Sequence, residues 1–430
     1  NSPFWGEFRL LDIPRAPVYI RSVLSGGTMD LNMPLIRILW MGGIFVFEWA
    51  WNSRMRLTMV VAMTRELAMI ATLPFLLLCC LETSAQTPGW SQPVNLKGSD
   101  SSRSEFLSMA VTPRGKVFAA WQSKNQLPWD LRAQIFLATS DGQVWSPPVA
   151  ITDTGVMDRT PDIAIDGSGG PHVVWCEYGS SDILYKHFDG VGWSEAQNVS
   201  ETRQGESYFP RIAIGSDNTV HFVWHDNFRE GTFQVLYRSF NVANGWSPSV
   251  ILSDTNFTGA FPHLVVGPGD TVHVAFCGEI PPKWSYEVFY RKGHHGSWSP
   301  IERITTDDTL ESVRPDIALD RNGHPNIVWD QQLNAYGDFA NGIRLVTKRG
   351  DTWSAPEVVY DTTESIRPSL AFDVNNSPHV IWYLRERANS RSSVLYSTRA
   401  SGSGPWTKPV SLSIPVVADP GESVIRADAQ

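Results

Sequence analysis

The stretch Pro161–Ser200, PDIAIDGSGGPHVVWCEYGSSDILYKHFDGVGWSEAQNVS, decides the fold class of this chain. It predicts four short β-strands, because apolar residues alternate with polar ones or cluster in short runs. The Gly, Pro and Asp-Gly clusters between these runs supply the backbone geometry that a chain reversal needs. One sheet of this size cannot bury both of its faces, so it requires neighbouring sheets.

The same pattern recurs along most of the chain. A Trp followed by Ser or Thr marks the predicted fourth strand and returns about every fifty residues, and an aromatic residue of the predicted second strand returns in step. A period of about fifty residues with four strands per unit is typical of a β-propeller. We therefore predict an all-β fold, a β-propeller of four-stranded blades. The fourth-strand residues are Trp90, Trp145, Trp193, Trp246, Trp298, Trp353 and Trp406.

Six complete repeats are expected, together with remnants of a probable seventh. The remnant 89–96 resembles a fourth strand, and the remnant 422–430 resembles the first strand that opens the fifth and sixth repeats. Together they predict an incomplete seventh blade, formed from both ends of the chain. The alternative is that six blades close the ring and the remnants are extra strands. The complete repeats span residues 103–153, 156–201, 205–255, 256–308, 309–362 and 363–413.

The first eighty-five residues lack the repeat, and helical periodicity is confined to them. The apolar run Leu67–Leu81 follows Arg65 and precedes the small residues Thr83-Ser84-Ala85, which is typical of a secretory signal peptide. We expect residues 59–85 to be this signal and residues 1–58 to be absent from the mature protein.

The mature protein is then the propeller at 86–430, secreted or periplasmic/extracellular. The apolar run is short for a bilayer span, so no stable membrane span is expected in the mature form. A lipoprotein anchor at Cys79 or Cys80 is the alternative.

Composition and motifs exclude several classes of function. The net charge is −9 and the chain has no basic stripe, so nucleic acid is not an expected partner. Zinc-protease, nucleophile-elbow and phosphate-loop motifs are all missing, and we expect no cofactor and no metal. Cys176 and Cys277 occupy equivalent positions two repeats apart, too far for a disulfide, so we expect free, buried thiols.

Four histidines recur at the start of the predicted second strand. Equivalent positions in different blades lie around a ring and do not converge on one ion, so these side chains are expected to be structural. They are His172, His221, His273 and His379.

The two faces of the predicted propeller differ. Turns on one face are short and uniform, whereas the second-to-third loops and the blade links on the other vary, and loops on a rigid scaffold carry function. Aromatic and charged side chains on the variable face suit sugars; the alternative interpretation is that they cap the core. Arg314 and Arg367 come from blade links beside the axial opening, where repeated Glu and Arg could instead form a structural ion-pair network. The candidate ligand-binding residues are Trp129, Asp130, Arg132, Asp226, Arg229, Glu230, Trp284, Tyr286, Arg314, Tyr336, Asp338, Arg367, Tyr383 and Arg385.

Three turns resemble the Asp-box (BNR) turn of sialidase-like β-propellers: SDGQVWS (Ser140–Ser146), FDGVGWS (Phe188–Ser194) and RGDTWS (Arg349–Ser354). The resemblance extends over nearly everything after Trp90 and implies a fold, not an activity. The sialidase Phe-Arg-Ile-Pro motif has no match, since YFPRIA (208–213) has the letters in another order. No catalytic residue is carried over, and the catalytic residues stay unknown. Seven-bladed relatives of this superfamily include lectins and some polysaccharide lyases.

Three hypotheses of function follow. The first is a secreted propeller that binds carbohydrate through the variable face, with a glycan or another extracellular ligand as partner. The second is a glycan-processing enzyme on the same face, either a sialidase-like exo-glycosidase or a polysaccharide lyase. The third is a structural or protein-interaction propeller.

Overall fold

A computed structural model gives the fold, and the chain divides into two units, Asn1–Pro88 and Gly89–Gln430. Each unit is described by itself. The structure describes residues 35–41, 44–52, 55–62, 91, 94–96, 103–124, 132–153, 155–201, 205–229, 232–281, 285–306, 310–332, 340–362, 364–386, 391–400, 404–412 and 424–426.

The first unit contains a three-stranded antiparallel sheet of β1 (Leu35–Met41), β2 (Ile44–Asn52) and β3 (Met55–Ala62). The sequence of the first eighty-five residues has helical periodicity, but the residues of this stretch form strands. Gly-Gly between β1 and β2 is a strong hairpin signal, and it outweighs the apolar spacing. Most of the expected signal peptide lies outside the described residues, so that expectation stays a prediction. Among the described residues, no helix has the length and apolar character that crossing a bilayer requires.

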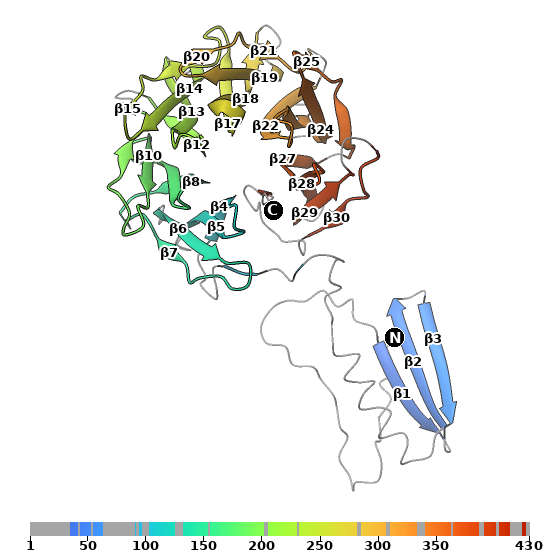
Figure 1. Ribbon diagram of the computed structural model, residues 1–430. Coiled ribbons are helices and arrows are strands. Elements are labelled where there is room, and N and C mark those ends of the chain that lie inside the picture. The colour runs from blue at the N-terminus through green and yellow to red at the C-terminus, as the bar shows by residue number, and fades with distance from the viewer. Residues whose placement is uncertain are drawn as a thin grey trace. The chain divides into compact units, whose positions relative to one another are not determined.

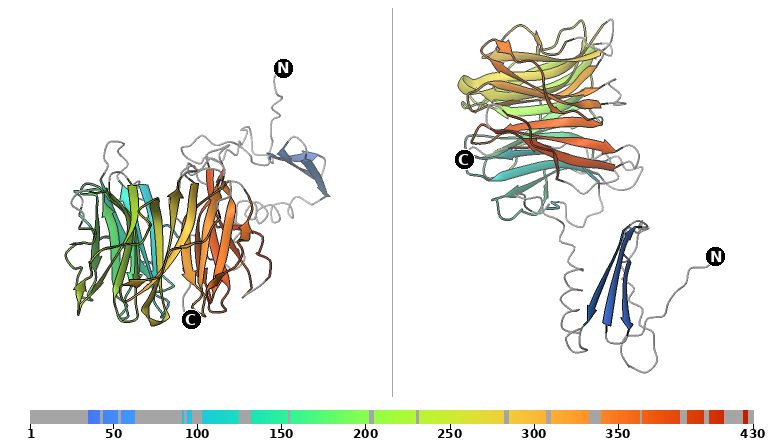
Figure 2. Two further views of the ribbon diagram at one scale, coloured as in Figure 1. Left: turned by 90° about the horizontal axis from the view of Figure 1, so that it is seen from above. Right: turned by 90° about the vertical axis from the view of Figure 1, so that its right-hand side faces the viewer.

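The second unit is a β-propeller of six antiparallel sheets around one axis, which confirms the predicted fold class (Figure 1). Its strands run between the two faces of the propeller (Figure 2). Each blade starts beside the axis and proceeds outward. The inner three strands of blade I are β4 (Arg103–Val111), β5 (Val117–Lys124) and β6 (Ala133–Ser140), and those of blade II are β8 (Asp158–Ile165), β9 (Pro171–Glu177) and β10 (Asp182–His187). Blade III has β12 (Ser207–Ile214), β13 (Val220–Arg229) and β14 (Thr232–Asn241), and blade IV has β17 (Thr258–Gly267), β18 (Thr271–Ile280) and β19 (Ser285–His294). Blade V has β22 (Glu311–Leu319), β23 (Pro325–Gln332) and β24 (Ala340–Arg349), and blade VI has β27 (Ser365–Phe372), β28 (Pro378–Glu386) and β29 (Arg391–Thr398).

The fourth strands are short, and only a few of their residues pair with the third strand. The repeated Ser or Thr after Trp has a clear role, since its hydroxyl accepts a backbone N–H of the third strand, as Ser247 does from Ser239 at 2.9 Å. A 3₁₀ turn, η1 (Pro268–Asp270), links β17 to β18. The outer strands are β7 (Val149–Ala150), β11 (Gln197–Asn198), β15 (Gly245–Trp246), β16 (Val250–Ile251), β20 (Ser297–Trp298), β21 (Glu302–Arg303), β25 (Thr352–Trp353), β26 (Glu357–Tyr360) and β30 (Val410–Ser411).

The repeated histidines pack between the blades. In blades II, III, IV and VI the His Nδ1 atom hydrogen-bonds a Tyr hydroxyl of the third strand, at 2.5 Å for His172–Tyr185 and 2.7 Å in the other three. In blades II, III and IV the fourth-strand Trp of the next blade packs edge-on against that Tyr, as Trp298 does against Tyr237 with ring centroids 4.8 Å apart. We call these four contacts the His–Tyr pairs; they hold each His within its own blade, as expected.

Both cysteines of the propeller are free and buried, as predicted. The Cys176 thiol donates to the Ser207 carbonyl at 3.1 Å, and the Cys277 thiol donates to the Ala260 carbonyl at 3.4 Å. Burial raises the pKa of each thiol to about 12. Thiolate chemistry at neutral pH is therefore strongly disfavoured.

Closure of the ring differs from the other blade contacts. Among the described residues, buried apolar clusters join blade I to II and so on to VI, whereas blades VI and I each end in a small cluster of their own. Residues 424–426 lie in this sector, where the Ile425 N–H donates to the Ser369 hydroxyl at 3.3 Å. Leu96 packs against the cluster of blade I. The described fold is six-bladed, and the seventh blade stays a prediction.

Candidate axial binding site

A repeated β-bulge shapes the axis of the propeller. The pairing of the first with the second strand shifts register at the same place in every blade. The residue at each bulge has a left-handed backbone, with φ between 49° and 54°, and this conformation is uncommon for residues other than Gly. Bulges re-aim side chains, and such strain persists where the surroundings over-determine it. The bulge residues are Phe106, Thr160, Phe209, Phe261, Arg314 and Arg367.

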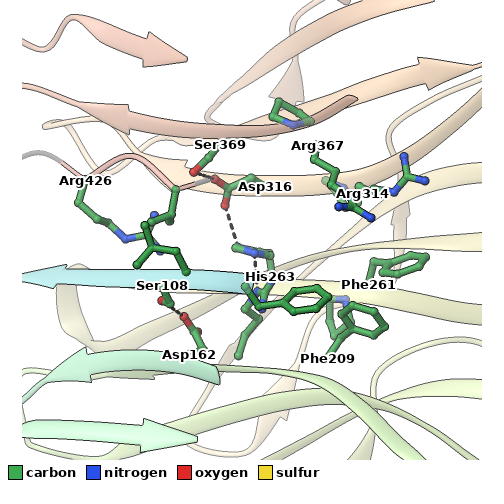
Figure 3. Close-up of a pocket in the computed structure, with 17 residues that line it drawn as sticks. Ser108, Asp162, Phe209, Phe261, His263, Arg314, Asp316, Arg367, Ser369 and Arg426 are labelled. Atoms are coloured by element: carbon green, nitrogen blue, oxygen red, sulfur yellow. Dashed lines mark hydrogen bonds and ion pairs between the residues drawn. The ribbon is translucent and has the colours of Figure 1, made fainter. Parts of the chain in front are cut away.

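A cavity of about 210 Å³ lies on the axis and is lined from all six blades and from the segment 424–426 (Figure 3). Its walls form two tiers. The bulge tier consists of the bulge residues other than Thr160. The inner tier lies two residues further along each first strand. First strands begin at the variable-loop face, so the bulge tier is nearer that face. The inner tier is Ser108, Asp162, Arg211, His263, Asp316 and Ser369.

Inner-tier side chains bond to one another across the blades (Figure 3). The Ser108 hydroxyl donates to Asp162 at 2.6 Å. Arg211 Nε donates to His263 Nε2 at 2.6 Å, and His263 Nδ1 lies 2.7 Å from an Asp316 carboxylate oxygen. The other oxygen of Asp316 accepts the Ser369 hydroxyl at 2.9 Å. These groups largely satisfy one another and form a polar floor.

Asp316 is the anionic centre of that floor. Burial opposes its ionisation, but the contact with His263, the charge of Arg426 and the Leu370 N–H outweigh burial and hold its pKa well below the ordinary value. The ionised carboxylate fixes the proton of His263 on Nδ1, which leaves Nε2 to accept from Arg211.

Two guanidinium groups dominate the bulge tier. Arg314 Nη1 donates to an Asp330 oxygen at 2.9 Å, and the Arg367 backbone N–H donates to the other oxygen at 3.1 Å. Asp330 is completely buried, so one carboxylate ties both arginine-bearing strands together. The Arg314 side chain remains 24% exposed. A guanidinium has five N–H donors, so the Asp330 contact leaves other donors of Arg314 to serve a ligand.

Aromatic rings form the facing wall. The Phe209 and Phe261 rings meet edge to face with centroids 5.2 Å apart, and the ring of His225 contacts both. In Figure 3 the Phe209 and Phe261 rings lie at the same end of the cavity as Arg314 and Arg367. The cavity therefore combines a cationic wall with an apolar one.

The lining carries an excess of positive charge. Arg211, Arg314, Arg367 and Arg426 line it against the carboxylates of Asp162 and Asp316 and against Asp330 behind Arg314, which leaves an excess of one positive charge. A cleft of one sign attracts counter-charged ligands over distance. The arrangement therefore suits an anionic ligand that also has an apolar face. Among the described residues, no cluster of His, Cys, Asp or Glu could hold a metal ion.

The structure brings together two of the predicted site residues, Arg314 and Arg367, and both line the cavity. Arg132, Tyr286 and Arg385 are at least partly accessible but do not line it. Asp226 and Tyr383 are buried within their blades, where Asp226 accepts the Ser207 hydroxyl at 2.5 Å. Trp129, Asp130, Glu230, Trp284, Tyr336, Asp338 and the Arg229 side chain lie outside the described residues and stay predictions.

Sequence reasoning missed the aromatic wall and the inner tier. The missed residues lie on first strands and in the segment 424–426, not in the variable loops that drew attention. A signal was present, because the bulge residue precedes Pro in five blades, and X-Pro recurs in step with the repeat. The missed residues are Phe209, Phe261, Arg426 and the inner tier of Ser108, Asp162, Arg211, His263, Asp316 and Ser369.

Comparisons with known proteins give the fold a context. No protein-family model and no curated protein matches the chain. Among solved structures, an ulvan lyase of a new polysaccharide lyase family, bound to -[GlcA(1-4)Rha3S]-, is similar at a TM-score of 0.52 and 11% identity, over 75% of this chain and 84% of that one.

Other similar structures include an α-L-arabinanase of Penicillium chrysogenum complexed with arabinobiose, at a TM-score of 0.44 and 14% identity over 69% of this chain and 93% of that one. A leech intramolecular trans-sialidase has a TM-score of 0.44 and 11% identity, over 76% of this chain and 70% of that one. The neighbours are thus sialidase, arabinanase and polysaccharide lyase propellers, as the sequence resemblance implied. At these identities the likeness concerns the fold.

Proposed function

We propose that the protein binds an acidic carbohydrate, with a sugar carboxylate or a comparable anionic group held in the axial cavity. The observation that carries this proposal is the placement of Arg314 and Arg367 opposite Phe209 and Phe261 in one cavity. Guanidinium groups bind carboxylates through charge-assisted, directional hydrogen bonds. Aromatic rings contact the C–H face of a sugar ring.

The strained bulges support a binding role. Each left-handed, non-Gly residue costs about 1–3 kcal/mol, and such residues concentrate at functional sites. A purely structural axis would gain nothing from holding Phe and Arg in this conformation. The solved neighbours named above act on glycans, which favours carbohydrate over other anionic ligands.

Export fits this function, since acidic glycans are extracellular polymers. We propose that residues 59–85 direct secretion and that the mature chain begins at Gln86. N-terminal sequencing of the exported protein tests this, and recovery of residues 1–58 on the secreted product would overturn it.

The test of binding is a glycan array followed by calorimetry with glucuronate and its neutral counterpart, glucose. Binding of the acidic sugar in the micromolar to millimolar range is expected, which corresponds to about 4–8 kcal/mol, with little binding of glucose. Arg367→Ala should weaken the binding of glucuronate, while Arg114→Ala, an exposed position outside the cavity, should leave it unchanged. Equal binding of both sugars by all three proteins would contradict the proposal.

A lyase activity at the same site is the second candidate, favoured by the arginines of the cavity, which suit a uronate carboxylate, and by the fold likeness to an ulvan lyase. In such a reaction a base removes the proton α to the uronate carboxylate, the C–O bond to the leaving sugar breaks, and a double bond forms in the product. A polyuronate incubated with the protein would show the ultraviolet absorbance of that double bond. Binding without any such product would leave the lectin function alone.

A further inference from the structure

A second cavity, of about 330 Å³, opens at the opposite end of the propeller, between blades V and VI. It is bounded by the turn from β22 to β23, the turn from β27 to β28 and the ends of β24 and β29. We call it the turn-face pocket. It shares no residue with the axial cavity, and its lining is Asp320, Asn322, His324, Asn326, Thr347, Arg349, Phe372, Asn376, Pro378 and Arg399.

The pocket coincides with a departure from the repeat. Blades II, III, IV and VI carry the His–Tyr pair at this level. In blade V the strand register places Asn326 at the His position, opposite Thr347 as His379 is opposite Thr398. Leu345 takes the place of the Tyr, opposite Val328 as Tyr237 is opposite Val223. An imidazole and a phenol are thus replaced by two smaller side chains.

The smaller side chains of blade V lie where, in other blades, the fourth-strand Trp of the next blade packs against the Tyr. Trp246, Trp298 and Trp353 each pack against the Tyr of the preceding blade. Trp406 of blade VI instead packs in a cluster that contains Leu345. The pocket therefore occupies a level that three of the other four described blade interfaces fill with a Tyr–Trp contact.

The lining presents hydrogen-bonding groups that described residues do not use. Arg349 is exposed and makes no ion pair with a described residue, and Arg399 Nε is buried without a partner although Nη1 bonds Glu357. His324 Nδ1 lies 3.0 Å from an Asp320 oxygen, which leaves Nε2 as an acceptor. The Oδ1 atom of Asn376 accepts the backbone N–H of Arg321 at 2.7 Å, so the side-chain N–H groups of Asn376 remain available.

These groups suit a neutral ligand better than an ion. Arg399 is paired with Glu357, and the carboxylate of Asp320 lines the pocket together with Arg349, so the pocket has no strong excess of either sign. Donors and an acceptor surround an apolar wall of Phe372 and Pro378, and a few convergent polar groups beside an apolar surface are typical of small-molecule sites.

We propose that the turn-face pocket binds a neutral monosaccharide unit, with Phe372 and Pro378 against its C–H face and Arg349, His324 and Asn376 on its hydroxyls. This site is separate from the acidic-sugar site on the axis and does not depend on it. Two sites on opposite faces would let one molecule contact two segments of glycan.

The test is calorimetry or ligand-observed NMR with the methyl glycosides of glucose, galactose, mannose and fucose, and with glycerol as a simple polyol. We expect at least one glycoside to bind with a millimolar Kd and glycerol to show no binding. Arg349→Ala should weaken glycoside binding about tenfold, and Asn326→His, which restores the larger ring, should abolish it. Arg321→Ala, an exposed position on the same turn outside the lining, is the matched control.

The outcomes separate cleanly. Arg349 is exposed, so its variant should fold, and thermal melting of Asn326→His shows whether that variant keeps the propeller. Absence of binding by all four glycosides, or binding that Arg349→Ala leaves unchanged, would overturn the proposal. Glycoside binding lost in Arg367→Ala but kept in Arg349→Ala would also overturn it, because the sugar would then occupy the axial cavity.

Discussion

The β-bulges and the His–Tyr pairs both recur at equivalent places in several blades, but they differ in what is kept constant from blade to blade. The His–Tyr pairs keep their side chains in four blades and use them for packing. The bulges keep their backbone, with φ near 50° in all six blades, and vary their side chains among Phe, Thr and Arg. Constant side chains indicate architecture here, whereas varied side chains on a constant strained backbone are what the proposed binding role requires.

The largest expected effect concerns Arg314, which has both a structural contact and a place in the cavity lining. Arg314 belongs to the bulges but also neutralises the fully buried Asp330. Arg314→Ala should therefore lower the free energy of unfolding by about 3 kcal/mol, because it leaves a buried charge without its partner. Urea unfolding measures this. Adding Asp330→Asn should recover much of the loss, and a cost for Arg314→Ala below about 1 kcal/mol would place Arg314 with recognition alone.

The second prediction concerns the packing ring. His273→Ala removes the partner of the buried Tyr290 hydroxyl and opens space beside it, so the free energy of unfolding should fall by about 2 kcal/mol. Binding of acidic sugar should not change. His294→Ala, at an exposed position, is the control and should cost under about 0.5 kcal/mol. Loss of sugar binding in His273→Ala with unchanged stability would reverse the assignment.

The smallest effect is a pH dependence at Glu311, the first residue of β22. Burial and the charge of Glu279 raise the pKa of Glu311 to about 7. The folded chain then holds this proton more tightly than the unfolded chain, so the carboxyl lowers stability as pH rises from its ordinary pKa of 4.5 to about 7, with no further change above.

Glu311→Gln should remove that contribution, so the melting temperature of the natural protein should fall relative to the variant across this pH window. The exposed substitution Glu195→Gln should show no such difference. A relative melting temperature that rises with pH would contradict the assignment for Glu311.

The fold was predictable because its signal repeats. In each Trp-Ser or Trp-Thr the hydroxyl accepts a third-strand N–H and the Trp packs between blades. Every blade needs these two contacts, so the dipeptide recurs once per blade. The sheet at 35–62 was missed because apolar spacing there resembled a helix, and only the hairpin dipeptide opposed it.

The site was predictable only in part. Arg314 and Arg367 were placed beside the axis because first strands begin there. Phe209 and Phe261 were not, since a regular strand would aim them elsewhere, and the bulge that turns them toward the cavity depends on backbone geometry. Arg426 required knowledge of where residues 424–426 lie in space.

Calorimetric titration of glucuronate into the natural protein and into Arg367→Ala tests the central claim most directly. Arg367 is a bulge residue that lines the axial cavity, so its removal should weaken recognition, and urea unfolding of the variant shows that it is folded. We predict binding of glucuronate by the natural protein and a loss of about ten- to a hundredfold in the variant, or about 1.4–2.8 kcal/mol. Unchanged affinity in a folded Arg367→Ala protein would contradict the assignment of the axial cavity as the binding site.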